Sequence, residues 1–211
     1  MAELIRGLDP DVIRENLAAV REEVGPGVQI LAATKYVPLE ELGALAEAGI
    51  ELCGENRAQD LIAKADARPG FTWDFIGQLQ SRKVKQILPV ARYVHSVASE
   101  SALEQLARHG TADTEVLVQV NIARDAGKAG IDPGELPAFL ERCPVRVVGL
   151  MTMPPRAERP EDSAPWFAAL RELAERHGLR ELSMGTTQDY AVAAREGATI
   201  VRIGSRLYTR Q

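Results

Sequence analysis

The chain contains very little cysteine and histidine. Of its 211 residues, two are cysteine and three are histidine. Cys53 and Cys143 show no C-x-x-C spacing, which excludes a disulfide scaffold and a cysteine-based zinc site, so both thiols are expected to be reduced. The sequence also lacks an H-E-x-x-H motif and any cluster of carboxylates or Cys/His ligands. We therefore expect no metal site.

Long apolar runs and an excess of basic residues are also missing. The 25 basic and 30 acidic residues give a net charge of −5, without a Lys/Arg block, which argues against binding to nucleic acid or to an anionic membrane surface. No apolar run approaches the roughly 18 residues that span a bilayer. Acidic residues also interrupt the first ten positions, where a secretory signal would be apolar. We expect a soluble, cytoplasmic protein.

The hydrophobic pattern predicts a repeating unit. With 45% hydrophobic residues, the chain can bury one substantial core, so residues 1–211 are expected to form a single domain. Short β-branched runs alternate with longer amphipathic stretches, which is typical of parallel strands joined by helices. Strands are predicted over 28–34, 50–53, 72–76, 92–96, 116–121, 146–150, 181–184 and 199–203. Helices are predicted over 39–48, 56–67, 81–88, 99–109, 133–142, 163–177 and 188–196.

The repeat length favours a barrel. Residues 28–205 hold eight units of about 22 residues each, which indicates an α/β fold, a single (β/α)8 TIM-like barrel. The alternative, an open doubly wound sheet, often carries G-x-G-x-x-G after its first strand, and none occurs here.

An extra helix is predicted ahead of the first strand, over 9–24. Asp9 is expected as its N-cap, Pro10 at the first helical position and Gly25 near its C-cap. Only SRLYTRQ follows the eighth strand, so the final helix of a complete barrel is missing there. We expect the N-terminal helix to cover this gap.

Lys35 is the first candidate for chemistry. It ends a strand that reads as buried, so its ammonium group would be partly desolvated and the neutral, nucleophilic amine favoured. Such an amine attacks aldehydes. The alternative is a lysine that reaches solvent or pairs with a carboxylate such as Glu55.

Residues 182–205 contain a candidate anion site. Gly185 permits a close turn after the seventh strand, Thr186 could cap the next helix, and Asp189 stands three residues later, as in a capping box. Gly204 allows a second close approach, and loops after strands seven and eight often hold phosphate in barrels. The alternative is that both glycines only satisfy turn geometry and Ser183 is a small packed residue.

Arg202 and His95 also lie near strand ends. The alternation of Val201 and Ile203 places Arg202 on the opposite side of its strand; inside the barrel its charge would need a ligand atom or a salt bridge to Asp74 or Glu55.

His95 could be a general base or metal ligand. No second histidine lies nearby, so a packed or hydrogen-bonded side chain is the commoner interpretation. A nucleophilic serine lacks support because no G-x-S-x-G occurs.

Several segments together resemble one family. They are LAATKYVP, GENRAQD, WDFIGQLQSRKVKQI, HSVAS, VLVQVNIARDAGKAGI, GLMTMPP and LSMG with VRIGS. They resemble the pyridoxal phosphate homeostasis proteins of the YggS/PROSC type, in order along nearly the whole chain. The resemblance implies a barrel related to the N-terminal domain of alanine racemase, in which the strand-one lysine holds pyridoxal 5'-phosphate as an internal aldimine.

The same resemblance implies roles for individual residues. Lys35 is the expected aldimine lysine, Arg202 faces the pyridine nitrogen, and Asn56 and His95 line the pocket. The residues expected around the phosphate are Ser183, Gly185, Thr186, Gly204 and Ser205.

Three segments depart from the family pattern. Arg82 replaces an asparagine, Ala98 replaces an aspartate, and MGTTQD replaces M-G-M-S-D-D. Thr186 and Thr187 keep hydroxyl donors, so phosphate binding is expected to survive, through one or the other. Lys128 matches a lysine of the family and is a candidate secondary attachment or delivery point.

These observations predict a carrier with little or no turnover. A guanidinium at the pyridine nitrogen leaves that nitrogen unprotonated and weakens the ring as an electron sink. Alanine racemase draws its opposing acid/base group from a second domain and a dimer partner, whereas this chain stops at Gln211. We expect a monomer that serves intracellular vitamin B6 homeostasis, with apo enzymes dependent on the cofactor as recipients.

Two alternatives remain. One is a racemase or lyase in which Tyr36 or Tyr208 supplies the missing acid. The other is a phosphate-binding barrel enzyme without a cofactor.

Overall fold

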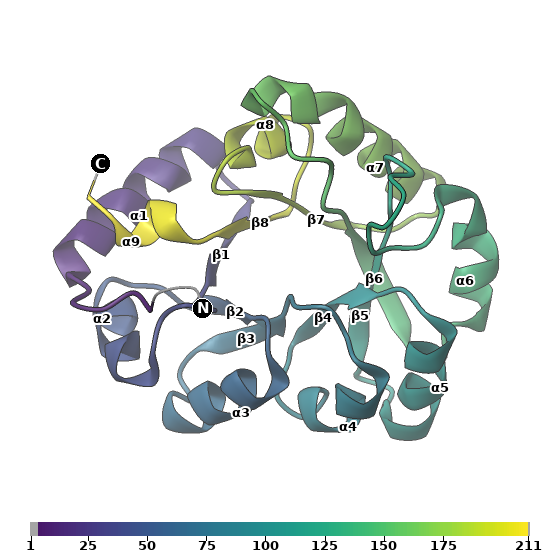
Figure 1. The fold of residues 1–211 in the computed structure, drawn as a ribbon, viewed down its shortest axis with the longest axis horizontal. Helices are drawn as coiled ribbons and strands as arrows, with labels where there is room; N and C mark the ends of the chain where they lie inside the picture. The colour runs from purple at the N-terminus through teal and green to yellow at the C-terminus, as the bar shows by residue number, and fades with distance from the viewer. Residues whose placement is uncertain (1–3, 211) are drawn as a thin grey trace.

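Eight parallel strands close into a barrel in chain order. The computed structural model describes residues 4–210. Each strand pairs with the next, and the last pairs with the first (Figure 1). The strands are β1 (Gln29–Ala33), β2 (Leu52–Glu55), β3 (Thr72–Phe75), β4 (Tyr93–Val97), β5 (Glu115–Gln119), β6 (Arg146–Met151), β7 (Glu181–Thr186) and β8 (Ile200–Ile203). All eight predicted strands are present, and the TIM-like barrel is confirmed.

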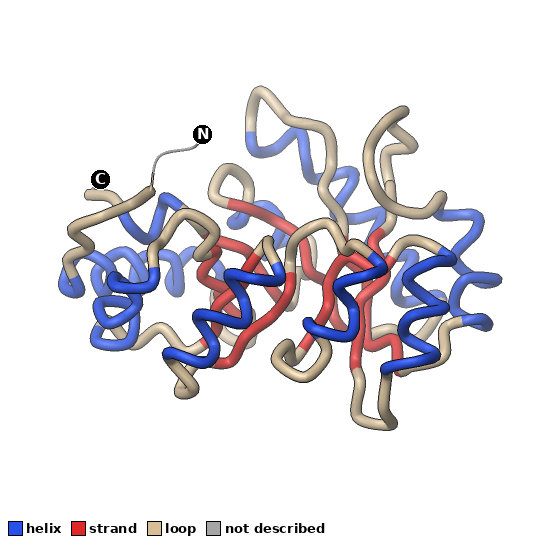
Figure 2. The backbone as a smooth tube through the Cα atoms, turned by 60° about the horizontal axis from the view of Figure 1, so that its bottom comes forward, coloured by secondary structure: helices blue, strands red, loops and turns tan. Residues whose placement is uncertain are grey.

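The helices surround the strands, as Figure 2 shows in blue around red. They are α1 (Pro10–Val24), α2 (Leu42–Glu47), α3 (Ala58–Ala67), α4 (Val84–Ile87), α5 (Glu100–His109), α6 (Leu136–Arg142), α7 (Ala164–Arg176), α8 (Tyr190–Arg195) and α9 (Ser205–Tyr208). Short 3-10 turns precede four of them, over 39–41, 81–83, 133–135 and 160–163. No helix within residues 4–210 is long and apolar enough to cross a membrane.

The apolar side chains form two cores because successive strand residues point to opposite faces. The larger core lies between the strands and the helices and includes Val201 and Ile203. A much smaller cluster of Leu31, Leu52 and Ile200 forms separately from it. Arg202 pairs in register with Leu31, which confirms that it faces away from its two apolar neighbours and into the barrel.

The N-terminal helix closes the ring of helices. Asp9 caps α1 by accepting a hydrogen bond from the backbone of Asp11, with Pro10 at the first position. Figure 1 shows α1 between α2 and α8, with α9 against it. The Asn16 amide donates to the carbonyl oxygens of Leu207 (3.1 Å) and Thr209 (2.9 Å). The expected cover over the gap is confirmed, although α9 also supplies one short helical turn there.

Candidate functional site

A cavity of about 380 Å³ opens at the carboxyl ends of the strands, where barrel enzymes carry their reactive groups. Its lining joins residues of β1, β7 and β8 with residues that follow β1, β2, β3, β6, β7 and β8 in the chain. The lining residues are Ile5, Ala33, Lys35, Tyr36, Asn56, Ile76, Met153, Thr186, Thr187, Arg202, Gly204, Ser205 and Tyr208. The structure therefore brings six of the nine expected site residues to one cavity; Gly185, His95 and Ser183 are not among its lining residues.

Lys35 lies at the rim of this cavity with an exposed side chain. The expectation that burial would desolvate its amine is therefore wrong, because β1 ends at Ala33 and Lys35 lies in the exposed turn that follows. Its Nζ lies 5.0 Å from the centre of the Tyr36 ring. Of the two alternatives, a lysine that reaches solvent is confirmed, whereas pairing with Glu55 is wrong, since that carboxylate is bound to Lys64. The amine is thus available to a ligand in the cavity.

The buried ion pair of Lys64 and Glu55 holds the backbone on either side of the cavity rim. Lys64 donates to Glu55 and to the carbonyl oxygen of Thr34 (2.8 Å), the residue before Lys35. The other Glu55 oxygen accepts from the backbone of Asn56 at 2.9 Å. Sequence reasoning missed this pair, although a signal exists: the buried residues of α3 recur every three positions and include Lys64.

The end of β7 differs in detail from the expectation. Gly185 lies within β7 rather than in a turn after it, but its φ of +86° and the 2.5 Å that would separate an added Cβ from the Cβ of Ala193 do require glycine. Thr186 does not cap the following helix, which begins only at Tyr190. Instead the carboxylate of Asp189 accepts from both the backbone (2.8 Å) and the hydroxyl (3.2 Å) of Thr186. These donors of Thr186 are therefore engaged within the protein.

Thr187 and the loop after β8 lie side by side in the lining of the cavity. The hydroxyl oxygen of Thr187 accepts from the backbone of Gly204 at 3.0 Å, which leaves its O–H available as a donor. Ser205 begins α9, and the first N–H groups of a helix have no partner within that helix. The N–H of Leu207 already donates to the carbonyl oxygen of Gly204 at 2.9 Å, whereas the Thr187 O–H and the backbone N–H of Ser205 can donate to an anion without breaking a hydrogen bond among the described residues.

Arg202 carries a buried charge at the inner side of the cavity. Only 6% of its surface is exposed. It donates to Ser183 Oγ (2.5 Å), the carbonyl oxygen of Thr152 (3.1 Å) and the sulfur of Met153 (2.9 Å). Three of its five N–H donors are thus used, and within residues 4–210 it forms no ion pair. The considered salt bridges to Asp74 and Glu55 are absent, because those carboxylates pair with Arg92 and Lys64.

Burial lowers the pKa of Arg202 to about 10, and Asp189 partly counteracts this. The guanidinium therefore remains charged at neutral pH. A buried cation with unused donors is costly unless a ligand supplies an acceptor.

Asn56 provides a second unsatisfied polar group at the cavity. Its side-chain oxygen is buried and accepts no hydrogen bond from residues 4–210. Buried polar atoms are normally satisfied in folded proteins. This oxygen can therefore accept a hydrogen bond from a ligand in the cavity.

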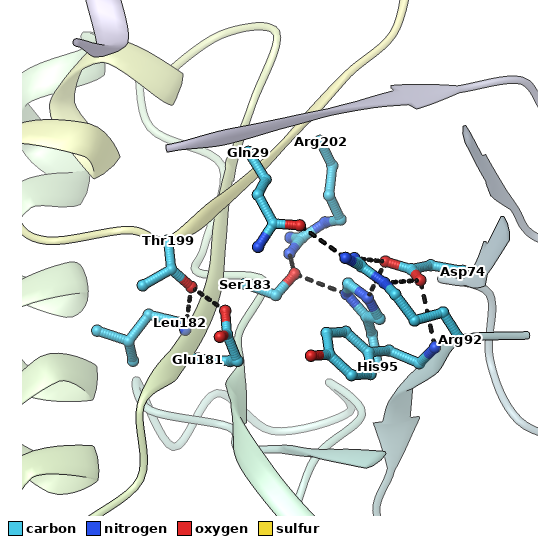
Figure 3. Close-up of polar contacts among 10 residues, drawn as sticks. Gln29, Asp74, Arg92, His95, Glu181, Leu182, Ser183, Thr199 and Arg202 are labelled. Atoms are coloured by element: carbon cyan, nitrogen blue, oxygen red, sulfur yellow. Dashed lines mark hydrogen bonds and ion pairs between the residues drawn. The ribbon is translucent and has the colours of Figure 1, made fainter. Parts of the chain in front are cut away.

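His95 and Ser183 lie beneath Arg202 rather than on the cavity lining. Both are fully buried, and Ser183 Oγ lies 2.8 Å from His95 Nδ1. The other ring nitrogen lies 3.0 Å from Asp74 Oδ2. Figure 3 shows this line of contacts from Arg202 through Ser183 and His95 to Asp74. The expectation that His95 is hydrogen-bonded is correct, and the Ser183 hydroxyl is already engaged by protein groups.

The protein should lose stability in mild acid because of His95. Burial lowers the pKa of this imidazole, and Asp74 only partly offsets the effect. The unfolded chain therefore takes up a proton near pH 6.5 while the folded protein does not, and stability falls below that pH by up to about 1.4 kcal/mol per pH unit. Urea denaturation at pH 7.5 and pH 5.5 measures the loss.

A His95→Gln variant is the control for this prediction, because it removes the titrating group. Its free energy of unfolding should change less with pH over the same interval. Asp74 affects stability in a different pH range: burial alone would raise its pKa, but hydrogen bonds from His95 and Arg92 lower it overall. Its contribution is lost only below about pH 3.8. Equal slopes for the variant and the wild type above pH 5 would contradict the assignment to His95.

A larger cavity of about 750 Å³ adjoins the first one and shares Met153, Thr186 and Arg202 with it. Gly185 lines this second cavity, together with Lys128. Lys128 is exposed and donates to the carbonyl oxygen of Pro154 at 2.9 Å. The second amine therefore lies next to the cavity that contains Lys35, not inside it.

The sequence pattern described as "Alanine racemase, N-terminal domain" matches residues 8–211. Two curated relatives are both named "Pyridoxal phosphate homeostasis protein". The protein from Aquifex aeolicus is 35% identical over 214 residues, covering 93% of this chain and 94% of its own. The protein from Pseudomonas aeruginosa is 35% identical over 218 residues with the same coverage of both chains.

Solved structures agree with this grouping. PipY of Synechococcus elongatus, determined without PLP, has a TM-score of 0.82 and 34% identity, covering 93% of this chain and 100% of its own. The same protein with PLP bound has a TM-score of 0.81. Alanine racemase from Corynebacterium glutamicum shares the fold, with a TM-score of 0.76 at 14% identity over 97% of this chain and 62% of its own. The chain belongs to the family of the alanine racemase N-terminal domain and, within it, to the pyridoxal phosphate homeostasis proteins.

Proposed function

We propose that this protein binds pyridoxal 5'-phosphate at the cavity beside Lys35 and serves intracellular vitamin B6 homeostasis as a carrier. One observation carries the proposal: the same cavity is lined by an exposed amine, that of Lys35, and by a buried guanidinium without an ion-pair partner among the described residues, that of Arg202. Two relatives named for this role and a solved relative with PLP bound support it.

The residues present match the chemical groups of the cofactor. Pyridoxal phosphate supplies an aldehyde, which condenses with a primary amine, and Lys35 Nζ is the amine at this cavity. Arg202 has two N–H donors left for the pyridine nitrogen, after three are used by protein groups. Asn56 offers an unsatisfied oxygen to a donor on the ligand.

The phosphate contacts are assigned to the side of the cavity formed by Thr187, Gly204 and Ser205. The hydroxyl of Thr187 has a free proton, while that of Thr186 is engaged by Asp189. Of the two threonines that the sequence left open, Thr187 is the better donor. Ser205 adds its hydroxyl and its own backbone N–H at the start of α9.

The same residues support carriage with little or no catalysis. Arg202, charged at neutral pH, would donate to the pyridine nitrogen without giving up its proton, which would weaken the ring as an electron sink. Tyr208, one of the two candidate acids of a racemase, donates to the carbonyl oxygen of Ala33 at 3.2 Å. Burial raises its pKa well above the usual value, so it is a poor proton carrier at neutral pH.

Incubation of the loaded protein with chiral amino acids should leave their optical purity unchanged.

Borohydride reduction of the loaded wild-type protein, followed by peptide mass mapping, tests the proposal. The chain has five lysines, and only the peptide with Lys35 should gain the mass of the reduced cofactor. Labelling of Lys128 instead would move the attachment point to the adjoining cavity. A colourless protein that borohydride does not modify would contradict the proposal and favour a phosphate-binding barrel enzyme without this cofactor.

A further inference from the structure

The inside of the barrel is filled by polar and charged side chains to an unusual extent. Barrel interiors of this fold are normally packed with branched apolar residues. Here Asp74, His95, Ser183 and Arg202 come from β3, β4, β7 and β8, and all four are buried. Such groups are costly to bury unless they serve each other or a ligand.

These four residues form one continuous chain of hydrogen bonds that reaches the cavity (Figure 3). Arg202 contacts Ser183 at 2.5 Å, Ser183 contacts His95 at 2.8 Å, and His95 contacts Asp74 at 3.0 Å. Arg92 closes the far end with two bonds to Asp74, at 2.9 and 2.6 Å. Its remaining amino group donates to Gln29, at the amino end of β1.

The chemistry of the two ends fixes the direction of every hydrogen bond between them. A guanidinium can only donate and an ionised carboxylate can only accept. Ser183 therefore accepts from Arg202 and gives its own proton to His95 Nδ1. His95 must then carry its hydrogen on Nε2, where it donates to Asp74. A hydrogen on Nδ1 would leave the Ser183 proton without an acceptor in a fully buried place.

This arrangement also explains why Arg202 keeps an unneutralised charge. Arg92 satisfies both oxygens of Asp74, and two neutral side chains separate that carboxylate from Arg202. Ser183 thus anchors the guanidinium without supplying a countercharge. The positive charge remains available to a ligand at the cavity.

We propose that Ser183, His95 and Asp74 are positioning residues that hold Arg202 in place, with unused donors, for the cofactor. This inference rests on the proposed function, because the ligand that benefits is pyridoxal phosphate. None of the three touches the cavity, so each acts through Arg202.

The first test uses the cofactor-free protein and needs no binding measurement. Long-range proton–nitrogen NMR of the nitrogen-15 labelled wild type at pH 7.5 reports which nitrogen of each imidazole is protonated. The chain has three histidines, so His109→Gln and His177→Gln variants assign the His95 signal by elimination. We expect a neutral ring with its hydrogen on Nε2. A hydrogen on Nδ1, or a doubly protonated ring, would overturn the proposed direction.

The second test is a double-mutant cycle on affinity for pyridoxal phosphate. Ser183→Ala should weaken binding about 10-fold in the wild type, equivalent to about 1.4 kcal/mol. In an Arg202→Lys background the same change should weaken binding less than about 2-fold, because the guanidinium that Ser183 anchors is gone. Ser96→Ala is the matched control, since Ser96 is a buried serine of β4 that bonds to Gly77 instead.

The outcomes separate this inference from the proposed function. Equal losses from Ser183→Ala in both backgrounds would show a merely structural role and would overturn the inference. If Ser183→Ala does not fold, the tautomer of wild-type His95 decides. If the wild type does not bind the cofactor at all, the proposed function fails, while the NMR result still tests the direction of the chain.

Discussion

Lys35→Ala is expected to abolish covalent retention of pyridoxal phosphate while leaving the fold intact. The variant should lose the yellow colour and the borohydride-fixed mass, because no other lysine lines the cavity. Since Lys35 is exposed, the free energy of unfolding should change by less than about 0.5 kcal/mol. Visible absorption after desalting and urea denaturation measure the two effects separately.

Noncovalent affinity should persist in this variant, because Arg202, Thr187 and Ser205 are unchanged. Lys85→Ala is the matched control: Lys85 is an exposed lysine on α4, and its loss should leave colour and labelling as in the wild type. Lys128→Ala tests the secondary attachment point in the same way. Retention of the yellow colour by Lys35→Ala would refute the assignment of the attachment residue.

Lys64→Met is expected to cost about 3–5 kcal/mol of unfolding free energy, because it leaves the carboxylate of Glu55 buried without a cation. For a chain of 211 residues this corresponds to a fall in Tm of about 6–20 °C. The cofactor should also bind more weakly, since Lys64 holds the Thr34 carbonyl and Glu55 holds the Asn56 backbone, the neighbours of the rim. Thermal and urea denaturation give the stability change.

Two controls isolate the charge. The double variant Lys64→Met with Glu55→Gln removes both charges and should recover most of the loss, to within about 1–2 kcal/mol of the wild type. Arg6→Met breaks an ion pair with Glu40 in which both side chains are more than half exposed, and it should cost less than about 1 kcal/mol. If Lys64→Met costs no more than Arg6→Met, the buried pair does not support the site.

The sequence predicted the order of strands and helices well because local patterns determine it. The strand predicted over 181–184 extends in the structure to Thr186. The sequence at Gly185 and Thr186 is typical of a turn, but these residues continue alongside β8. The helix predicted over 81–88 is a 3-10 turn followed by the short α4. Where an element ends depends on the neighbouring elements that it packs against. The periodicity of the sequence carries no information about those neighbours.

The candidate site was predicted less completely. The residues at the strand ends could be named, because closure of the barrel brings those ends together. The partners of charged residues could not: Lys64 reaches Glu55 from a helix, and Asp74 chooses Arg92 over Arg202. These choices follow from the relative placement of several strands and helices, and a linear pattern only says that each buried charge needs a partner.

The contact of α1 with α9 and the pairing of β1 with β8 have a consequence for biosynthesis. β1 is translated long before β8, with which it pairs. Asn16 likewise precedes its hydrogen-bond acceptor, the carbonyl oxygen of Leu207, by 191 positions. Until β8 and α9 have emerged from the ribosome, the nascent chain therefore has an open first strand and an uncovered apolar side of its first helix. Contacts so distant along the chain form slowly and leave these surfaces prone to aggregation in the meantime. The ring can close only after β8 and α9 have emerged, so a truncation that removes α9 should harm the first helix as much as the last.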